Sequence, residues 1–211
     1  KSIYCELIFY QIEQRKKESC FMVCKWEVTI PQLSGDVPRR VYVYLPESYD
    51  REPERRYPVM YMFDGHNVFF DEDATYGKSW GLGDYLDAHG KELIVAAVEC
   101  NHSGSRRLAE YSPVSFAEPS LGKVTGKGRA YMNWMVQNLK PRIDERYRTL
   151  PGRANTILAG SSMGGLMALY GAAAYNDVFR RAACLSRAGA AAGADRQGAY
   201  PPGYLHLHGL R

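Results

Sequence analysis

The chain has 211 residues and a formal net charge of +4, with 45% hydrophobic and 24% charged residues. This length and composition are typical of one globular domain with a sizeable core. Acidic and basic residues are interleaved, as in 51–56, rather than gathered into a basic stripe, so we expect no nucleic-acid partner. No stretch is apolar for long enough to suggest a membrane span.

The cysteines indicate a reducing compartment. There are five, an odd number with no Cys-x-x-Cys pair: Cys5, Cys20, Cys24, Cys100 and Cys184. Proteins that depend on disulfides usually carry an even number at regular spacings. The first residues, which include Glu6 and Glu13, are too charged for a secretory signal. We therefore expect reduced thiols and a cytoplasmic protein.

The regular part of the chain opens with a predicted hairpin. Residues 26–30 and 40–45 alternate in character and are rich in β-formers, and Gly35, Asp36 and Pro38 mark a turn between them. Successive side chains of a strand point to opposite faces. The second strand would then have two sets: Val41, Val43 and Leu45 on one face, Tyr42 and Tyr44 on the other.

Alternating strands and helices follow. Apolar runs at 59–63, 93–98, 156–159 and 182–185 are typical of central strands covered on both faces. Helices are expected at 82–89, 129–147 and 165–175. In the second of these, Tyr131, Met135, Leu139 and Ile143 form one apolar stripe, which Pro141 should kink or split. This order predicts an α/β sandwich with a mostly parallel sheet.

The most informative segment is a Gly-x-Ser-x-Gly motif formed by Gly160, Ser162 and Gly164. An apolar strand precedes it and a helix of small residues follows, which is the setting that a nucleophile elbow requires. The two glycines remove Cβ atoms that would collide in such a tight turn. The alternative is a glycine-serine turn in which Ser162 only caps the helix; the flanking strand and helix favour the nucleophile.

Two backbone amides are candidates for an oxyanion hole. The amide of Met163 would begin the helix, with the positive end of the helix dipole behind it. The second donor is expected in the loop after the strand at 59–63, where Gly65 lets the backbone approach a ligand and His66 or Asn67 supplies the amide. The alternative is a polar turn in which Asp64 and Asn67 bond the local backbone.

Five motifs in this order resemble a known family: Val41-Tyr-Val-Tyr-Leu-Pro46, Phe63-Asp-Gly-His66, Arg107-x-x-Glu110-Tyr111-x-Pro113, Leu139-Lys-Pro-Arg-Ile-Asp144 and Gly160-Ser-Ser-Met-Gly-Gly165. The family is that of the putative esterases (esterase D-like) among the α/β hydrolases. It includes carbohydrate, feruloyl and acetyl esterases, S-formylglutathione hydrolase and enterobactin esterases.

The resemblance covers residues 25–186 and implies a three-layer α/β-hydrolase sandwich. It implies Ser162 as the nucleophile and the amides of Met163 and His66 as the oxyanion hole. Glu110 and Tyr111 match a motif near the site, either as substrate contacts or as anchors of a loop. Gly65 and Asn67 are further candidates for substrate binding, while His102 and Arg106 in the same region rank lower.

The far end departs from this pattern. A serine nucleophile needs a histidine base oriented by a carboxylate, which follow it in this fold. After Ser162 the candidates are few: Asp177, Asp195, His206 and His208. Residues 187–211 contain 11 Ala or Gly in 25 positions, too little apolar bulk for further strands. We expect an atypical, out-of-frame or foreign tail and a C-terminally incomplete hydrolase domain.

These patterns predict three segments. Residues 1–24 form an N-terminal extension of uncertain nature, 25–186 the esterase domain and 187–211 the tail, and Met22 is a candidate natural start. The predicted function is a serine carboxylic-ester hydrolase that acts on a small-molecule ester through an acyl-enzyme on Ser162, without metal or organic cofactor. The alternative is a hydrolase-like scaffold that binds an acyl or sugar ligand without turnover. The oligomeric state stays open.

Overall fold

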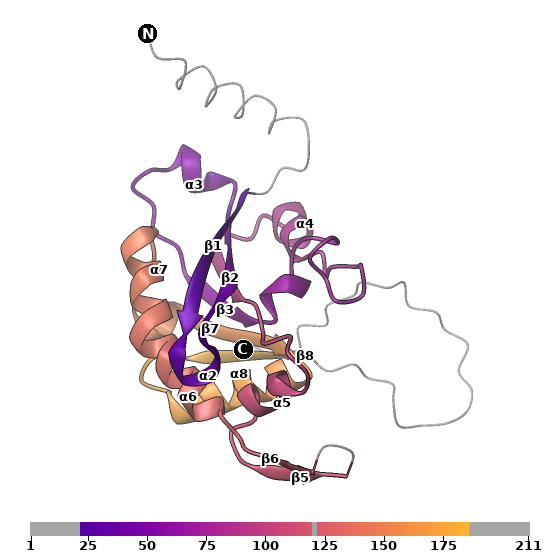
Figure 1. Cartoon of the computed structure of the whole chain (residues 1–211). Coiled ribbons are helices and arrows are strands. Elements are labelled where there is room, and N and C mark those ends of the chain that lie inside the picture. The colour runs from indigo at the N-terminus through magenta and orange to yellow at the C-terminus, as the bar shows by residue number, and fades with distance from the viewer. Residues whose placement is uncertain (1–21, 120–121, 186–211) are drawn as a thin grey trace, which may run out of the picture.

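A six-stranded mixed sheet forms the centre of the protein in the computed structural model, which describes residues 22–119 and 122–185 (Figure 1). Two antiparallel pairings, β1 with β2 and β2 with β4, precede three parallel ones that join β4, β3, β7 and β8. The strands, in spatial order, are β1 (Met22–Ile30), β2 (Gly35–Leu45), β4 (Ile94–Val98), β3 (Val59–Phe63), β7 (Thr156–Ser161) and β8 (Arg181–Leu185). The mixed, mostly parallel α/β fold confirms the prediction.

The opening hairpin is present, but its turn lies earlier than predicted. The turn is a short helix, α2 (Pro31–Ser34), and residues 36–38 already belong to β2. Proline favours a first helical turn because its φ is fixed near the helical value, and Gly35 ends the turn with a φ of 60°. The strand β1 also begins at Met22, before the predicted domain start at residue 25.

Helices cover both faces of the sheet. One buried cluster contains Val41 and Val43 together with residues of α6 and α8, and the other contains Tyr42 and Tyr44 together with residues of α4. The two sets of side chains predicted for β2 therefore pack into two separate cores, one on each face of the sheet. The main helices are α4 (Leu82–Ala88), α6 (Gly128–Trp134), α7 (Lys140–Arg146) and α8 (Met163–Ala174). None of the described helices has the length and apolarity that crossing a membrane requires.

The remaining elements are short and lie in the connections: α3 (Ser48–Arg51), η1 (Gly65–Asn67), α5 (Arg106–Glu110), β5 (Phe116–Glu118), β6 (Gly122–Val124) and η3 (Arg153–Asn155). Strands β5 and β6 form a two-stranded hairpin that is separate from the main sheet.

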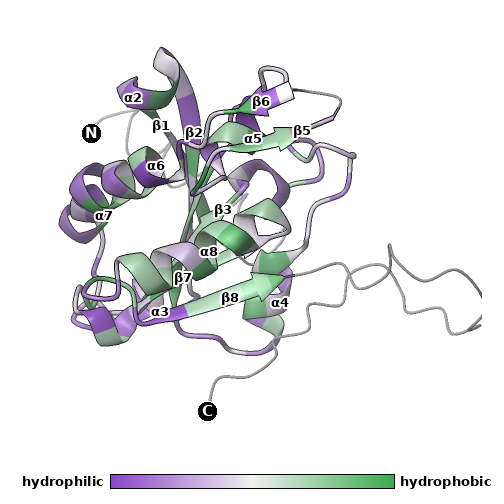
Figure 2. Cartoon of the chain, turned by 90° about the horizontal axis from the view of Figure 1, so that it is seen from below, coloured by the Kyte–Doolittle hydropathy of each residue, from purple (hydrophilic) through white to green (hydrophobic). Residues whose placement is uncertain are grey.

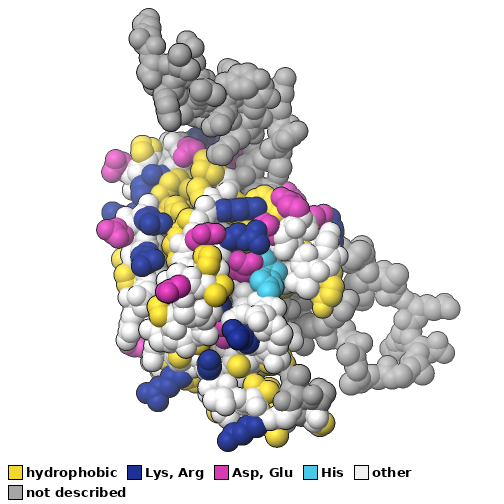
Figure 3. Space-filling model, in the orientation of Figure 1, with side chains coloured by type: hydrophobic (Ala, Val, Ile, Leu, Met, Phe, Trp, Pro, Cys, Tyr) yellow, Lys and Arg dark blue, Asp and Glu magenta, His cyan; other side chains and the backbone are white. Residues whose placement is uncertain are grey.

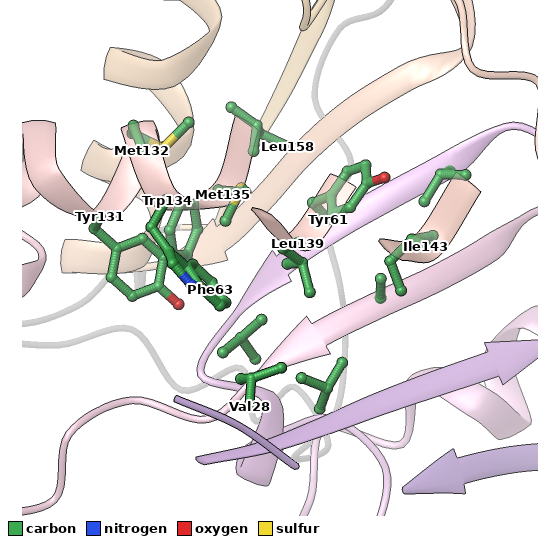
Figure 4. Close-up of a cluster of buried hydrophobic side chains, with 14 of the residues drawn as sticks. Val28, Tyr61, Phe63, Tyr131, Met132, Trp134, Met135, Leu139, Ile143 and Leu158 are labelled. Atoms are coloured by element: carbon green, nitrogen blue, oxygen red, sulfur yellow. The ribbon is translucent and has the colours of Figure 1, made fainter. Parts of the chain in front are cut away.

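The apolar stripe predicted across 129–147 is confirmed. Tyr131, Met135, Leu139 and Ile143 are fully buried and point toward the sheet (Figure 4). The helix is divided as expected: a π-helical segment, η2 (Met135–Leu139), joins α6 to α7. Pro141 occupies the first turn of α7. The widened turn accommodates a residue that has no N–H and whose ring would collide with an earlier carbonyl.

Among the described strands, β8 is an edge of the sheet and is less covered than the centre. All five residues of β4 are buried, whereas every residue of β8 is at least partly exposed. On the neighbouring helix α8, Leu166 is 45% and Leu169 is 57% exposed. Figure 2 shows the mainly hydrophobic colouring of α8 and β8 at this side of the molecule. The described residues thus leave an apolar surface here.

Replacing Leu139 tests the importance of the buried stripe. Leu139→Ala removes a fully buried side chain and should lower the free energy of unfolding by about 2–5 kcal/mol, because the cavity adds to the lost burial. Urea denaturation followed by circular dichroism measures this. Gln137→Ala on the exposed side of the same segment is the control; equal losses for both variants would contradict the assignment.

Candidate active site

The Gly-x-Ser-x-Gly motif forms a strained turn between β7 and α8. Ser162 has φ 55° and ψ −118°, and it is one of two non-glycine residues with positive φ in the described part of the chain. Such a conformation costs about 1–3 kcal/mol and persists only where the surroundings impose it. Ser162 is exposed, and its backbone N–H donates to the carbonyl of Leu185 at the end of β8 (2.9 Å). The turn therefore presents the serine hydroxyl outside the sheet.

Both glycines of the motif are closely packed, and Gly160 leaves no space for a side chain. A Cβ on Gly160 would lie 2.4 Å from the carbonyl carbon and oxygen of Gly164, closer than any side chain tolerates. A Cβ on Gly164 would lie 3.1 Å from Cβ of Phe63 and 3.3 Å from Oδ2 of Asp64. The elbow therefore packs directly against the end of β3 and the residue that follows it.

Parallel pairing brings the second predicted loop beside the elbow. Tyr61 and Met62 of β3 pair with Leu158 and Ala159 of β7, so the carboxyl ends of both strands lie at the same edge. The loop begins with Asp64 in the left-handed region (φ 59°, ψ 47°). The structure thus brings together the two segments that supply the candidate amides.

The candidate donors occupy positions without partners inside their own helices. Met163 is the first residue of α8, and the first amides of a helix have no intrahelical acceptor. Gly65 fits tightly, because a Cβ there would lie 2.6 Å from the carbonyl oxygen of Ala97. This contact seats η1, with the amide of His66, on the end of β4. Asn67 is partly buried, and its side-chain oxygen accepts from the amide of Thr75 (2.9 Å), a local bond of the kind that the alternative reading expected.

An ion pair that the sequence did not predict supports the elbow. Arg107 donates to both carboxylate oxygens of Asp64, from Nε at 2.7 Å and from Nη2 at 2.6 Å. The backbone N–H of Asp64 donates to the hydroxyl of Tyr111 (3.1 Å). Hydrogen bonding to Asp64 raises the pKa of Arg107 further above its usual range. Asp64 is 1% exposed, so its charge is balanced inside the protein.

A second buried pair places Glu110. Arg39 donates from Nη1 to Oε2 of Glu110 at 2.7 Å and from Nη2 to Oε1, and Asn101 donates to Oε1 at 3.3 Å. Burial opposes the charge of Arg39, yet its pKa is raised because the bonds and charge of Glu110 outweigh burial. Glu110 and Tyr111 are both buried with partners inside the protein. The geometry thus supports their role as loop anchors rather than as substrate contacts.

The side chain of His66 is buried in the same region. Its Nε2 lies 3.0 Å from Oγ1 of Thr75, and its ring meets the ring of His102 edge to face, with 4.4 Å between centroids. Burial, and secondarily the charge of His102, lowers the pKa of His66 to about 4. The imidazole of His66 is therefore neutral near pH 7.

The described residues place no general base beside Ser162. Within residues 22–119 and 122–185, no hydrogen bond joins the Ser162 hydroxyl to a histidine. Asp177 is exposed in the turn after α8, as expected for a surface position. The other candidates, Asp195, His206 and His208, lie outside the described residues, as do Cys5 and Cys20.

A strained serine between a parallel strand and a helix defines the class of the α/β hydrolases. Residues 34–193 match the model of the Putative esterase family, and the chain belongs to this family. It is 35% identical over 144 residues to Esterase Rv1288 of Mycobacterium tuberculosis (strain H37Rv), a match that covers 67% of this chain and 27% of that protein. The family resemblance seen in the sequence is confirmed.

Solved structures share the fold at lower identity. An IroE-like serine hydrolase from Shewanella oneidensis matches with a TM-score of 0.59 and 20% identity, over 76% of this chain and 49% of its own. A ferulic acid esterase, AmCE1/Fae1A from Anaeromyces mucronatus in complex with ferulic acid, matches with a TM-score of 0.54 and 22% identity, over 83% and 62%. The chain thus spans only part of the length of these proteins.

Breaking the buried pair should destabilise the protein. Arg39→Met leaves the Glu110 carboxylate buried without its cation, which costs about 3–5 kcal/mol of unfolding free energy. Chemical denaturation measures the loss. The double variant R39M/E110L should recover part of it, because neither charge of this pair then remains buried.

The matched control for this prediction is Arg51→Met. Arg51 pairs with Glu47 on the surface, with side chains 64% and 58% exposed, and such pairs contribute about 0–1 kcal/mol. A loss for Arg39→Met no larger than that for Arg51→Met would show that the buried pair does not hold the loop.

Proposed function

We propose that this chain carries the nucleophile and the oxyanion hole of a serine carboxylic-ester hydrolase. The observation that carries the proposal is the conformation of Ser162, a non-glycine residue at φ 55° with its side chain exposed between β7 and α8. Strain of this kind is maintained by the packing of Gly160 and Gly164. A serine that only capped the helix would not need this strained conformation. Ser162 also forms no side-chain cap hydrogen bond.

The reaction proceeds through an acyl-enzyme. The Ser162 hydroxyl attacks the ester carbonyl carbon while a base takes its proton, and the carbonyl oxygen becomes an oxyanion. The N–H groups of Met163 and His66 donate to that oxygen, with the dipole of α8 adding positive potential. The intermediate collapses and expels the alcohol, which regains a proton from the base. Water then repeats the attack and frees the acid.

The proposed substrate is a small-molecule ester. The Anaeromyces structure was solved with ferulic acid, which makes an ester of an aromatic acid a reasonable first probe for this chain. Gly65 and Asn67 lie in the loop beside the elbow and would flank the carbonyl. The proposed cytoplasmic location rests on the odd number of five cysteines without a Cys-x-x-Cys pair; cell fractionation would test it.

A second candidate function is binding of an acyl or sugar ligand without turnover. It is favoured by one observation: in the part of the chain that the structure describes, no histidine hydrogen-bonds to Ser162. A serine without a base is a weak nucleophile. An oxyanion hole alone can still leave about 10³–10⁴-fold acceleration over water, so the two functions differ in the size of the rate.

Replacing Ser162 separates these functions. The full chain should hydrolyse p-nitrophenyl acetate and methyl ferulate, and Ser162→Ala should lower kcat by about 10³-fold or more. Ser161→Ala is the matched control, since Ser161 belongs to β7, and it should keep most of the activity. Rates for the parent equal to those of Ser162→Ala would favour the binding scaffold instead.

A further inference from the structure

Three potential metal ligands converge next to the candidate oxyanion loop. His66, Cys100 and His102 each place one ligand atom, a ring nitrogen or the sulfur, within 4.8 Å of the others. His66 follows β3, and the other two follow β4. The pairing of Phe63 with Val98 at the ends of these parallel strands brings the two loops together.

The orientation of His66 leaves one nitrogen free in the interior. Its Nε2 bonds to Oγ1 of Thr75, whereas Nδ1 is buried without a hydrogen-bond partner among the described residues. His66 is only 2% exposed. A buried unpaired nitrogen normally costs free energy. If Nε2 carries the proton and donates a hydrogen bond to Thr75, Nδ1 has a free lone pair, which a metal ligand requires.

In His102, as in His66, the Nε2 atom has a partner inside the protein. Its Nε2 lies 3.0 Å from Oε1 of Glu99. Glu99 is itself fixed by Arg40, whose backbone N–H and side chain both donate to it. A carboxylate that accepts from one ring nitrogen orients the ring and raises the basicity of the other, an arrangement found around metal-bound histidines. His102 therefore also directs its Nδ1 lone pair away from the Glu99 contact.

Cys100 supplies the third atom. It is 4% exposed and is a free thiol. The nearby carboxylate of Asp64 is occupied by Arg107 at both oxygens, so the available set is two nitrogens and one sulfur. Thiolate and imidazole together favour zinc over magnesium or calcium, which prefer oxygen. On binding, the thiol would release its proton to solvent.

We propose that His66, Cys100 and His102 form a binding site for one Zn²⁺ ion, with the fourth coordination position open to solvent. The side chain of His102 is 51% exposed, which gives the ion a path from the surface. Figure 3 shows histidine surface between acidic and basic side chains on one face of the molecule. Tetrahedral zinc holds its ligand atoms about 3.3–3.8 Å apart. The three ligand atoms already lie within 4.8 Å of one another, and rotation of the exposed His102 side chain can adjust their separation.

Such an ion would fix the loop that carries the amide of His66. It would join η1 to the loop after β4 through bonds stronger than the present ring contact. The sequence offered no sign of this site, since the ligands are spread over 37 positions and only the topology of β3 and β4 unites them. Metal binding by these three residues does not depend on whether Ser162 is a nucleophile.

Cobalt binding tests the proposal. The full chain, freed of metal with a chelator, is titrated with Co²⁺, whose bond to a thiolate gives a charge-transfer absorption. His206→Ala and His208→Ala are present in every protein compared, because two histidines alone can bind a divalent cation. We expect one Co²⁺ per chain, the thiolate band, and displacement by Zn²⁺.

Three variants locate the site. Cys100→Ser should abolish the band. His102→Ala should weaken Co²⁺ binding by more than about 10-fold, because even the loss of a group that only hydrogen-bonds to a metal ligand lowers affinity by about that factor. His102 is partly exposed, so its variant should fold even if Cys100→Ser does not. His89→Ala is the control, because exposed His89 lies against Tyr85 and should leave binding unchanged. A band that is absent from the parent, or that survives in Cys100→Ser, would overturn the proposal.

Discussion

The parallel pairing of β3 with both β4 and β7 is the constraint on which the site depends. It places the carboxyl ends of three strands at one edge of the sheet, so that the loop at 64–67, the loop after β4 and the elbow all emerge together. In open α/β sheets this edge is where ligands bind. Contacts at Gly65 and Gly160, where a Cβ would lie under 3.0 Å from backbone atoms, and the tight packing of Gly164 on Phe63 and Asp64 then fix the spacing between these loops.

Buried charge keeps this edge in place. The segment around α5 contributes Arg107, Glu110 and Tyr111, and each contacts a residue far from it in sequence. Arg107 and Tyr111 hold Asp64 in its left-handed conformation, while Glu110 ties α5 to Arg39 on β2. Of the two roles that the sequence left open for Glu110 and Tyr111, the contacts of this segment favour that of loop anchors beside the candidate oxyanion loop. Removing one partner would leave a charge without compensation in the interior.

Much of the fold was predictable because hydrophobic patterns report burial directly. The run at 59–63 matches β3 residue for residue. The spacing of Tyr131, Met135, Leu139 and Ile143 identified the face of α6, η2 and α7 that packs on the sheet. The elbow was also predictable, since its requirement for Gly160 and Gly164 is local. The turn of the first hairpin was misplaced because Pro31 and Gly35 define a helical turn that alternation does not reveal.

The less predictable features depend on which distant segments meet. Nothing near Asp64 in sequence indicates that Arg107 is its partner, and the histidine–cysteine cluster unites two loops that no local motif relates. The general base remains a prediction, because no histidine hydrogen-bonds to Ser162 among the described residues. Local chemistry identifies a nucleophile, whereas the groups that activate and support it are defined by topology.

Covalent labelling of the full chain with a fluorophosphonate, followed by mass analysis of its peptides, tests directly whether Ser162 is an activated nucleophile. Such reagents form an adduct with a serine hydroxyl that is both exposed and activated. We predict one adduct, on Ser162, that is absent from Ser162→Ala and unaffected by Ser161→Ala. An adduct on Ser161 or elsewhere, or no adduct after prolonged exposure, would contradict the assignment of Ser162 as the nucleophile.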